Sequence, residues 1–246
     1  VGVVDEMLDP LAKSTSDTAS STDAPKEVPE NDDDASNEPD QDDEPPSFSE
    51  TFQEELSEKS EKALSVLEKE LEKKLYKEPS NPTYLRQYAE LQNHLGYIEN
   101  SLTLYYQYLA MHPNDAKVMA RVGDMHRRLS QFDPCIKILE KAYALDPKNQ
   151  FIISNLASAY RSKKQYNKAK DLLQKGLEYN PQSANIMVLL AQCHNKQQQP
   201  ERGEEIIRKQ LFITPNHIPA LIVLTESLLL QSRFIDAEAF LNQADQ

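Results

Sequence analysis

Five prolines recur along the chain at a constant interval of 34 residues, and this period constrains the fold more than any other feature of the sequence. They are Pro79, Pro113, Pro147, Pro181 and Pro215. Proline lacks a backbone N–H and its ring clashes with the preceding helical turn, so each proline marks a place where a helix must end. The equal intervals predict a repeated unit that has room for two helices and two short turns.

The segments between the prolines have a helical composition. Leu, Ala, Glu, Lys and Gln dominate after residue 50, only 5 Gly are present, and no stretch alternates like a strand. We therefore expect an all-α chain in which each unit holds an A helix and a B helix. The A helices are predicted at 82–95, 116–129, 150–163, 184–197 and 218–231, and the B helices at 98–111, 132–145, 166–179, 200–213 and 234–245. Polar residues near the prolines suit helix caps: Asn81, Asn114, Asn149, Asn180 and Asn216.

Small side chains recur at fixed positions inside each unit. Counted from residue 82, the eighth position holds Ala89, Gly123, Ala157, Ala191 and Thr225, and the twentieth holds Ser101, Cys135, Ala169, Gly203 and Ala237. In this pattern and in its period the sequence resembles the tetratricopeptide repeat family over about residues 80–246. The resemblance implies a right-handed solenoid of helical hairpins with repeats at about 80–113, 114–147, 148–181, 182–215 and 216–246.

The residues before the repeats divide into two parts. Residues 27–44 hold ten carboxylates and no basic side chain. A segment with so little apolar surface cannot offset its chain entropy, so we expect a disordered acidic segment over 1–46. From Ser47, which forms a candidate capping box with Glu50, apolar residues recur every three or four positions, and this predicts one long amphipathic helix within 47–79, from about Phe48 to Lys77.

The charge of the chain is concentrated at one end. Residues 1–79 hold 24 acidic and 8 basic side chains, whereas residues 80–246 hold 16 acidic and 19 basic ones. An acidic segment repels phosphates, which disfavours nucleic acid as a partner. No apolar run is long enough to span a membrane. Because the chain begins at Val1, we expect a processed product or a piece of a longer protein, and the compartment stays open between the cytoplasm and an envelope protein without its anchor.

Sequence motifs for catalysis, cofactors or metals are missing. The sequence has no phosphate-binding loop, no Cys-x-x-Cys pair and no Gly-x-Ser-x-Gly turn. His126 and His194 both occupy the eleventh position of a repeat, a packing position, so we interpret them as structural. Cys135 and Cys193 lie in different repeats and are expected to be free thiols. We therefore predict no enzyme, no cofactor and no metal site.

The resemblance implies that partners bind on the concave face, which the A helices line. The candidate residues there begin basic and end apolar: Arg86, Lys117, Arg121, Arg128, Asn155, Arg161, Val188, Leu189, Ile222 and Val223. Arginine can donate two hydrogen bonds to one carboxylate, so an acidic segment is one candidate ligand. The alternative is a solvated face beside a buried apolar cluster.

One family subtype holds the acidic tails of chaperones through a two-carboxylate clamp of Lys, Asn, Asn, Lys and Arg. Aligned from the first repeat, this chain has Arg86, Glu90, Arg121, Phe151 and Asn155 at those positions. Glu90 would repel a carboxylate, and an alignment from the second repeat keeps only Asn155 of the five. The resemblance therefore does not extend to chaperone-tail binding.

The sequence leaves three functional hypotheses. The first is a non-catalytic adaptor that holds a protein or peptide segment in the groove. The second is an oligomeric structural protein that associates through the last repeat and the predicted helix from Phe48 to Lys77. The third is the regulatory part of a larger enzyme. The acidic segment is also a candidate ligand for the chain's own basic groove, the alternative being a tail that only adds solubility.

Overall fold

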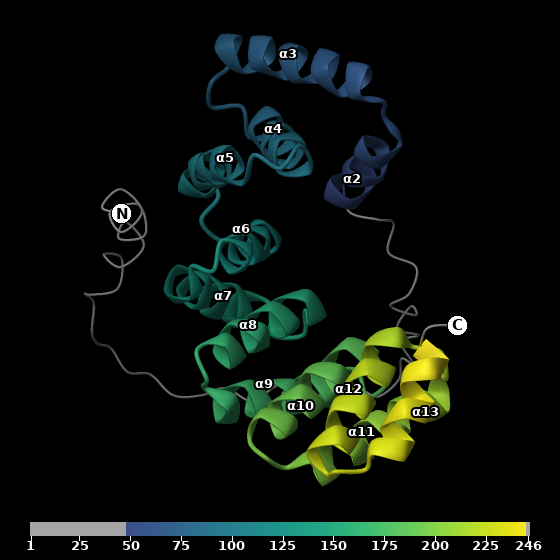
Figure 1. The fold of residues 1–246 in the computed structure, drawn as a ribbon. Helices are drawn as coiled ribbons and strands as arrows, with labels where there is room; N and C mark the ends of the chain where they lie inside the picture. Colours follow the sequence, from purple (N-terminus) through teal and green to yellow (C-terminus); the bar gives the residue numbers. More distant parts are fainter. Residues whose placement is uncertain (1–47, 245–246) are drawn as a thin grey trace, which may run out of the picture. The chain divides into compact units, whose positions relative to one another are not determined.

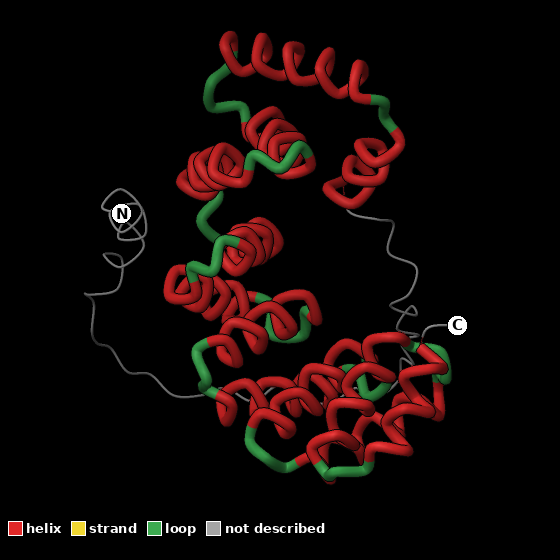
Figure 2. The backbone as a smooth tube through the Cα atoms, in the orientation of Figure 1, coloured by secondary structure: helices red, strands yellow, loops and turns green. Residues whose placement is uncertain are grey.

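The computed structural model describes residues 48–244, and their side chains from residue 52 to residue 240. Within this range the chain forms twelve helices and no strand (Figures 1 and 2). The predicted all-α class is therefore confirmed for the described residues. The predicted disordered segment at 1–46 and the predicted cap at Ser47 lie outside them. The described chain divides into two compact units, one ending at Tyr108 and one starting at Leu109.

The first unit opens with two helices where the sequence predicted one. Helix α2 spans Phe48–Glu58 and α3 spans Glu61–Lys77. The single-helix prediction is wrong because Ser60 adopts an extended backbone and its side chain accepts a hydrogen bond from the amide of Ala63 at 3.4 Å, which starts a new helix. Both helices contact α4 (Pro82–His94), and a core cluster joins the three: Phe52, Leu56, Leu64, Leu71 and Leu91.

Helix α5 (Ile98–Met111) runs across the boundary, and the second unit then alternates A and B helices. Its A helices are α6 (Ala116–Arg128), α8 (Gln150–Ser162), α10 (Ala184–Lys196) and α12 (Ile218–Leu230). Its B helices are α7 (Phe132–Leu145), α9 (Tyr166–Tyr179), α11 (Pro200–Ile213) and α13 (Phe234–Ala244). All these bounds fall within one residue of the prediction, which is therefore confirmed.

The turns between repeats explain this regularity. The five prolines lie in the turns that follow α3 and the B helices α5, α7, α9 and α11. The caps of the next A helices follow two residues later, at Asn81, Asp115, Asn149, Ser183 and His217. The predicted caps at Asn114 and Asn216 are thus one residue early. Asn180 instead ends α9 as its C-cap.

The turns that join the A helix to the B helix of each repeat share a second backbone feature. One residue in each turn adopts a positive φ: Gly96, Ser130, Lys164, Gln198 and Ser232. The backbone amide of the residue after it donates a hydrogen bond to the carbonyl oxygen five positions back. For example, the amide nitrogen of Gln131 lies 2.8 Å from the carbonyl oxygen of His126. This is the hydrogen bond of a Schellman C-cap, which ends the A helix and reverses the chain into the B helix.

Candidate functional site: the A-helix face of the second unit

The A helices of the second unit lie side by side. Helix α6 contacts α8, α8 contacts α10, and α10 contacts α12, while each A helix also packs on its own B helix (Figure 1). The A helices therefore form one layer. We use the term A-helix face for the surface made by their first, second, fifth, sixth, ninth, twelfth and thirteenth positions.

Polar side chains join α6 to α8 at this face. Arg127 forms an ion pair of 2.6 Å with Asp124, and its Nε also donates to Oδ1 of Asn155 at 3.1 Å. The amide of Asn155 in turn donates to the carbonyl of Phe151 at 3.0 Å, and the Asn155 side chain is buried. Asn155 was predicted to bind a partner. Its hydrogen bond from Arg127 instead joins two neighbouring repeats.

The same arrangement continues along the layer. Asn185 of α10 donates to the Ser154 hydroxyl of α8 at 3.1 Å. Between α10 and α12, Asn195 donates to Glu226 and accepts from the Ser227 hydroxyl, and Lys196 forms an ion pair of 2.8 Å with Glu226. Both carboxylates at the face positions of this unit, Asp124 and Glu226, therefore already have cationic partners on the same face.

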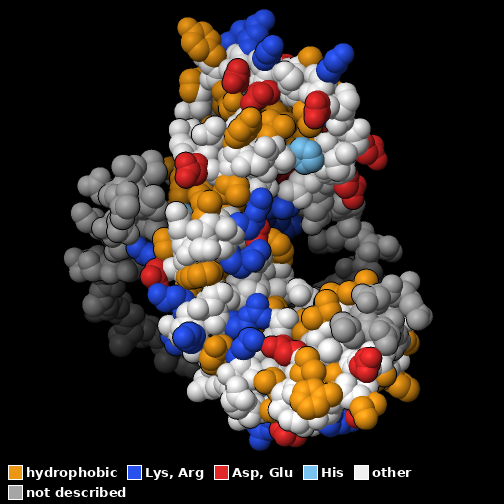
Figure 3. Space-filling view, viewed as in Figure 1, with side chains coloured by type: hydrophobic (Ala, Val, Ile, Leu, Met, Phe, Trp, Pro, Cys, Tyr) orange, Lys and Arg blue, Asp and Glu red, His pale blue; other side chains and the backbone are white. Residues whose placement is uncertain are grey.

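Four basic side chains form what we call the cationic cluster: Lys117, Arg121 and Arg128 of α6 and Arg161 of α8. Lys117 and Arg128 are exposed, and Arg121 and Arg161 are half-buried. The Arg121 guanidinium lies 6.0 Å from the ring centroid of the exposed Phe151. Figure 3 shows Lys and Arg side chains gathered in the part of the molecule where α6 and α8 lie in Figure 1. The A-helix face is thus positively charged at its α6–α8 end.

The fifth predicted basic residue, Arg86, belongs to the first unit. It lies on α4 and is half-buried. Arg86 is therefore not a member of the cationic cluster, which belongs to the second unit alone.

Three of the four predicted apolar contact residues are buried. Val188, Leu189 and Val223 are 6%, 8% and 1% exposed, respectively, and Val188 and Val223 belong to a core cluster between α10 and α12. The structure corrects their interpretation, because these three side chains are packed inside the helix layers and offer no exposed apolar surface to a partner. In α12 the fifth-position residue, Ile222, is 55% exposed.

Ile222 forms part of an apolar stripe on α12. Ile218 and Leu229 are also exposed, and the spacing of the three residues places them on one side of the helix. Figure 3 shows apolar side chains on the surface where α11 to α13 lie. We call Ile218, Ile222 and Leu229 the α12 stripe. The sequence reasoning missed Ile218 because it counted groove positions only from the second residue of each helix.

The buried histidines and cysteines have structural surroundings. The Nδ1 atoms of His126 and His194 lie 2.7 and 3.0 Å from the side-chain oxygens of Gln131 and Gln199, respectively. Burial lowers the pKa of both histidines, and these hydrogen bonds only partly oppose it. Cys135 and Cys193 are free and buried, as predicted. Burial raises the pKa of Cys135 to about 12, which makes it a poor nucleophile.

The described residues contain neither a metal-binding group nor a membrane-spanning helix. Between residues 48 and 244, His, Cys, Asp and Glu side chains form no group of three or more that could hold a metal ion. No described helix is both long enough and apolar enough to cross a membrane.

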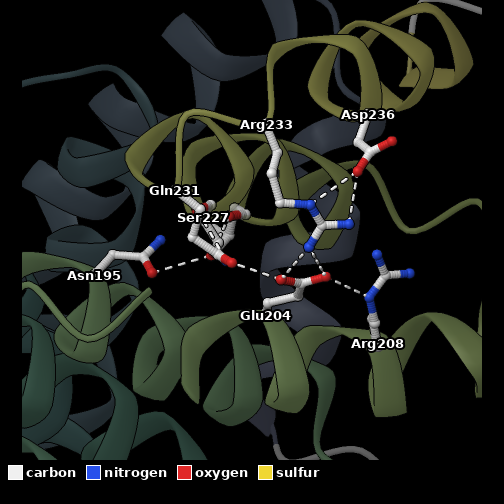
Figure 4. Close-up of polar contacts among 8 residues, drawn as sticks. Asn195, Glu204, Arg208, Ser227, Gln231, Arg233 and Asp236 are labelled. Carbon is white, nitrogen blue, oxygen red and sulfur yellow. Dashed lines mark hydrogen bonds and ion pairs between the residues drawn. The ribbon is translucent and has the colours of Figure 1, made fainter. Parts of the chain in front are cut away.

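A second polar cluster joins α11 to the last repeat (Figure 4). Both oxygens of Glu204 accept hydrogen bonds from Arg233, at 2.9 and 3.0 Å, and Arg208 and Gln231 donate to it at 2.8 Å each. Burial acts to raise the pKa of Glu204, but the hydrogen bonds from Gln231, Arg208 and Arg233 outweigh it, so the pKa lies below its usual value. The donors come from α11 itself and from the turn before α13, so this cluster fixes the last hairpin.

Comparisons with known proteins agree with this geometry. Two tetratricopeptide repeat family models match, one over residues 116–149 and the other over residues 160–220. None of the curated proteins compared with the chain matches it.

Three solved structures illustrate the likeness. A tetratricopeptide repeat protein from Parabacteroides merdae superposes with a TM-score of 0.69 at 18% identity over 78% of each chain. MamA from Desulfovibrio magneticus gives 0.60 at 18% identity over 66% of this chain and 92% of its own. YrrB, described as a tetratricopeptide repeat protein with an unusual peptide-binding site, gives 0.56 at 16% identity over 71% and 90%. At such identities the likeness shows the fold alone. On the 34-residue period, the matching repeat models and this shared fold, the chain is a tetratricopeptide repeat protein.

Proposed function

We propose that this protein is a non-catalytic adaptor that holds an extended segment of a partner protein on the A-helix face. The observation that carries the proposal is the presence of two chemically different exposed surfaces on one layer of helices. The cationic cluster lies on α6 and α8, and the α12 stripe lies two helices further along. A segment that fits both has carboxylates in one part and apolar side chains in another.

The cationic end favours carboxylates because the one carboxylate at the face positions of α6 and α8, Asp124, is already paired with Arg127. Arginine presents a planar fork that can donate two parallel hydrogen bonds to one carboxylate. Side chains of Asp or Glu on a partner therefore gain charge-assisted hydrogen bonds there, and the attraction weakens with added salt.

The apolar end favours burial of aliphatic or aromatic side chains. A helix that is apolar on nearly all sides is normally buried, whereas α12, with the sequence IPALIVLTESLLL, leaves the α12 stripe exposed. Neighbouring helix axes lie about 8–10 Å apart, so α8 and α12 are separated by roughly 16–20 Å. An extended chain rises about 3.3 Å per residue, so roughly five or six residues separate the acidic and the apolar parts of the ligand.

The solved structures support binding of a peptide by this kind of fold. YrrB, which has the same fold, is described as having a peptide-binding site. Tetratricopeptide repeats are typical of non-enzymatic interaction modules, which agrees with the surroundings of the buried histidines and cysteines.

Peptide display tests the proposal without knowledge of the partner. Random peptides of about 15 residues are selected on the whole chain at low salt, and enriched peptides are measured by fluorescence anisotropy. We expect Asp or Glu in one part and large apolar residues in the other. Binding should weaken in Lys117→Gln/Arg161→Gln and in Ile222→Asp.

A matched control replaces two exposed lysines of B helices, Lys137→Gln/Lys175→Gln, and should leave binding unchanged. Enriched peptides that lack acidic residues, or that lose affinity only in the control protein, would contradict the proposal.

A second candidate function is self-association through the last repeat. The observation in its favour is that Phe234 and Ile235, at the start of α13, are 64% and 85% exposed. Light scattering over a range of concentrations tests it, because self-association raises the mass with concentration. A mass that stays constant and equal to that of Ile235→Asp removes this candidate.

A further inference from the structure

We propose that residues 27–44 of this chain bind to the cationic cluster and compete with acidic partners for it. This inference rests on the proposed function, because it requires that the cationic cluster binds carboxylates. It adds a regulatory element to that function: the chain carries its own weak competitor.

The two segments are complementary in charge. Residues 27–44 contain ten carboxylates and no basic side chain. At the face positions of α6 and α8, basic side chains outnumber acidic ones, and Asp124 already pairs with Arg127. Electrostatic attraction of this kind requires no defined register between the two partners. It therefore suits a segment whose composition predicts disorder.

The chain between residues 27–44 and Phe48 gives these carboxylates a long reach. Residues 27–44 lie between 4 and 21 positions before Phe48, the first described residue. At about 3.3 Å per residue, an extended chain allows their carboxylates to reach up to roughly 70 Å from Phe48. A short flexible tether gives an effective concentration on the order of mM when it can span the two sites.

This effective concentration determines how strongly residues 27–44 weaken the binding of a competing ligand. A segment that binds with a dissociation constant of roughly 0.1–1 mM at an effective concentration of about 1 mM weakens a competing ligand about two- to tenfold. The Debye length is about 30 Å at 0.01 M salt and about 3 Å at 1 M. The competition should therefore be strong at low salt and disappear at high salt.

The first experiment measures competition. The probe is a fluorescent peptide with the sequence of residues 27–44, titrated by anisotropy with the whole chain and with a variant of equal length. In that variant the ten carboxylates of residues 27–44 are replaced by Asn or Gln. We expect the neutral-segment variant to bind the probe about two- to tenfold more tightly at 20 mM salt, and the difference to vanish at 500 mM.

The second experiment separates contact from long-range repulsion of the probe. A carbodiimide joins a carboxylate to a lysine amine only when the two are in contact, and the products are mapped by mass spectrometry in the absence of the probe. We expect crosslinks from residues 27–44 to Lys117, which lies in the cationic cluster, at low salt only. Lys175, exposed on the B helix α9, is the matched reference and should not be joined.

The outcomes distinguish this inference from the function on which it rests. If the neutral-segment variant binds the probe through Lys117 and Arg161 but no tighter than the whole chain does, the cationic cluster is a binding site and self-competition is wrong. If neither protein binds the probe, both the inference and the acidic part of the proposed function fail. Crosslinks that form equally with Lys117 and Lys175 would also overturn the inference.

Discussion

Gly123 tests the helix packing on which the whole repeat register rests. It occupies the eighth position of α6, where the sequence predicts close approach of the paired helix. A Cβ placed on Gly123 would overlap the Leu139 side chain of α7, and Leu139 is fully buried. Any larger residue must therefore push the two helices apart or force Leu139 out of its rotamer.

The expected change in the free energy of unfolding at Gly123 follows from two opposing contributions. Alanine gains about 1 kcal/mol over glycine in a helix interior. Overpacking a filled core costs about 1–3 kcal/mol. We expect Gly123→Ala to lower the free energy of unfolding by about 0–2 kcal/mol, and Gly123→Leu, which adds three further carbons at the same point, by more than 3 kcal/mol.

Gly176 provides a matched comparison. A Cβ there would lie 2.9 Å from Cδ1 of Ile186 and 3.1 Å from Cγ2 of Ile153. The nearer atom is the far end of a flexible side chain that can move aside. Gly176→Ala should therefore be less destabilising than Gly123→Ala.

The assay is urea unfolding followed by far-ultraviolet circular dichroism. A double-mutant cycle with Leu139→Ala isolates the clash, because Leu139→Ala alone costs about 2–5 kcal/mol but also removes the atoms that a new Cβ would meet. We expect the double mutant to lose about 1–3 kcal/mol less than the sum of the single changes. Additive changes, or a Gly123→Ala protein more stable than the parent, would refute the packing argument.

Three further predictions concern other parts of the chain. Deletion of residues 1–46 should leave the thermal midpoint nearly unchanged, and a large fall would show that this segment packs on the repeats. Thiol titration of the unfolded, unreduced protein should find Cys135 and Cys193 both reactive, whereas in the native protein both should react slowly because they are buried; fewer than two thiols would indicate a bridge. Glu204→Gln should lower stability by about 1–2 kcal/mol at pH 7, because Glu204 accepts charge-assisted hydrogen bonds from Arg208 and Arg233. The pKa of Glu204 is depressed in the folded protein, so its contribution to stability is present above the unfolded pKa of about 4.3 and is lost as the pH falls through the folded pKa. In urea unfolding between pH 7 and pH 3, the stabilities of the variant and the parent should therefore converge. A difference that stays constant over this range would argue against a stabilising role of the Glu204 charge.

The helices of the repeats could be predicted closely because their ends have local causes. A proline in each inter-repeat turn stops one helix, and a polar cap such as Asn81 or Asn149 starts the next. The break between α2 and α3 was missed although Ser60 and Glu61 carry a start signal. The apolar spacing continues from Leu56 to Leu64 across the break, so periodicity alone could not reveal it.

The candidate site could be predicted only in part. Lys117 and Arg128 are exposed as expected, because long charged side chains stay in water. Val188 and Val223 are buried because they belong to one core cluster with residues of α10, α11, α12 and α13, and a single sequence position does not record those contacts. Asn155 illustrates the same limit, since its partner Arg127 lies 28 residues away.

The hydrogen bonds of the A-helix layer join neighbouring repeats through residues other than those of the proposed binding surfaces. Arg127 with Asn155, and Asn195 with Ser227, join neighbouring helices through side chains that are half-buried or buried. Contacts in a solenoid extend only to adjacent repeats, so each pair fixes its own neighbours and leaves the exposed positions beside it unconstrained. Lys117 at one end and Ile222 at the other can therefore differ in chemistry without any change in the packing between them. A single layer of helices thus presents a charged surface and an apolar surface two helices apart, which the proposed binding of an extended, chemically mixed segment requires.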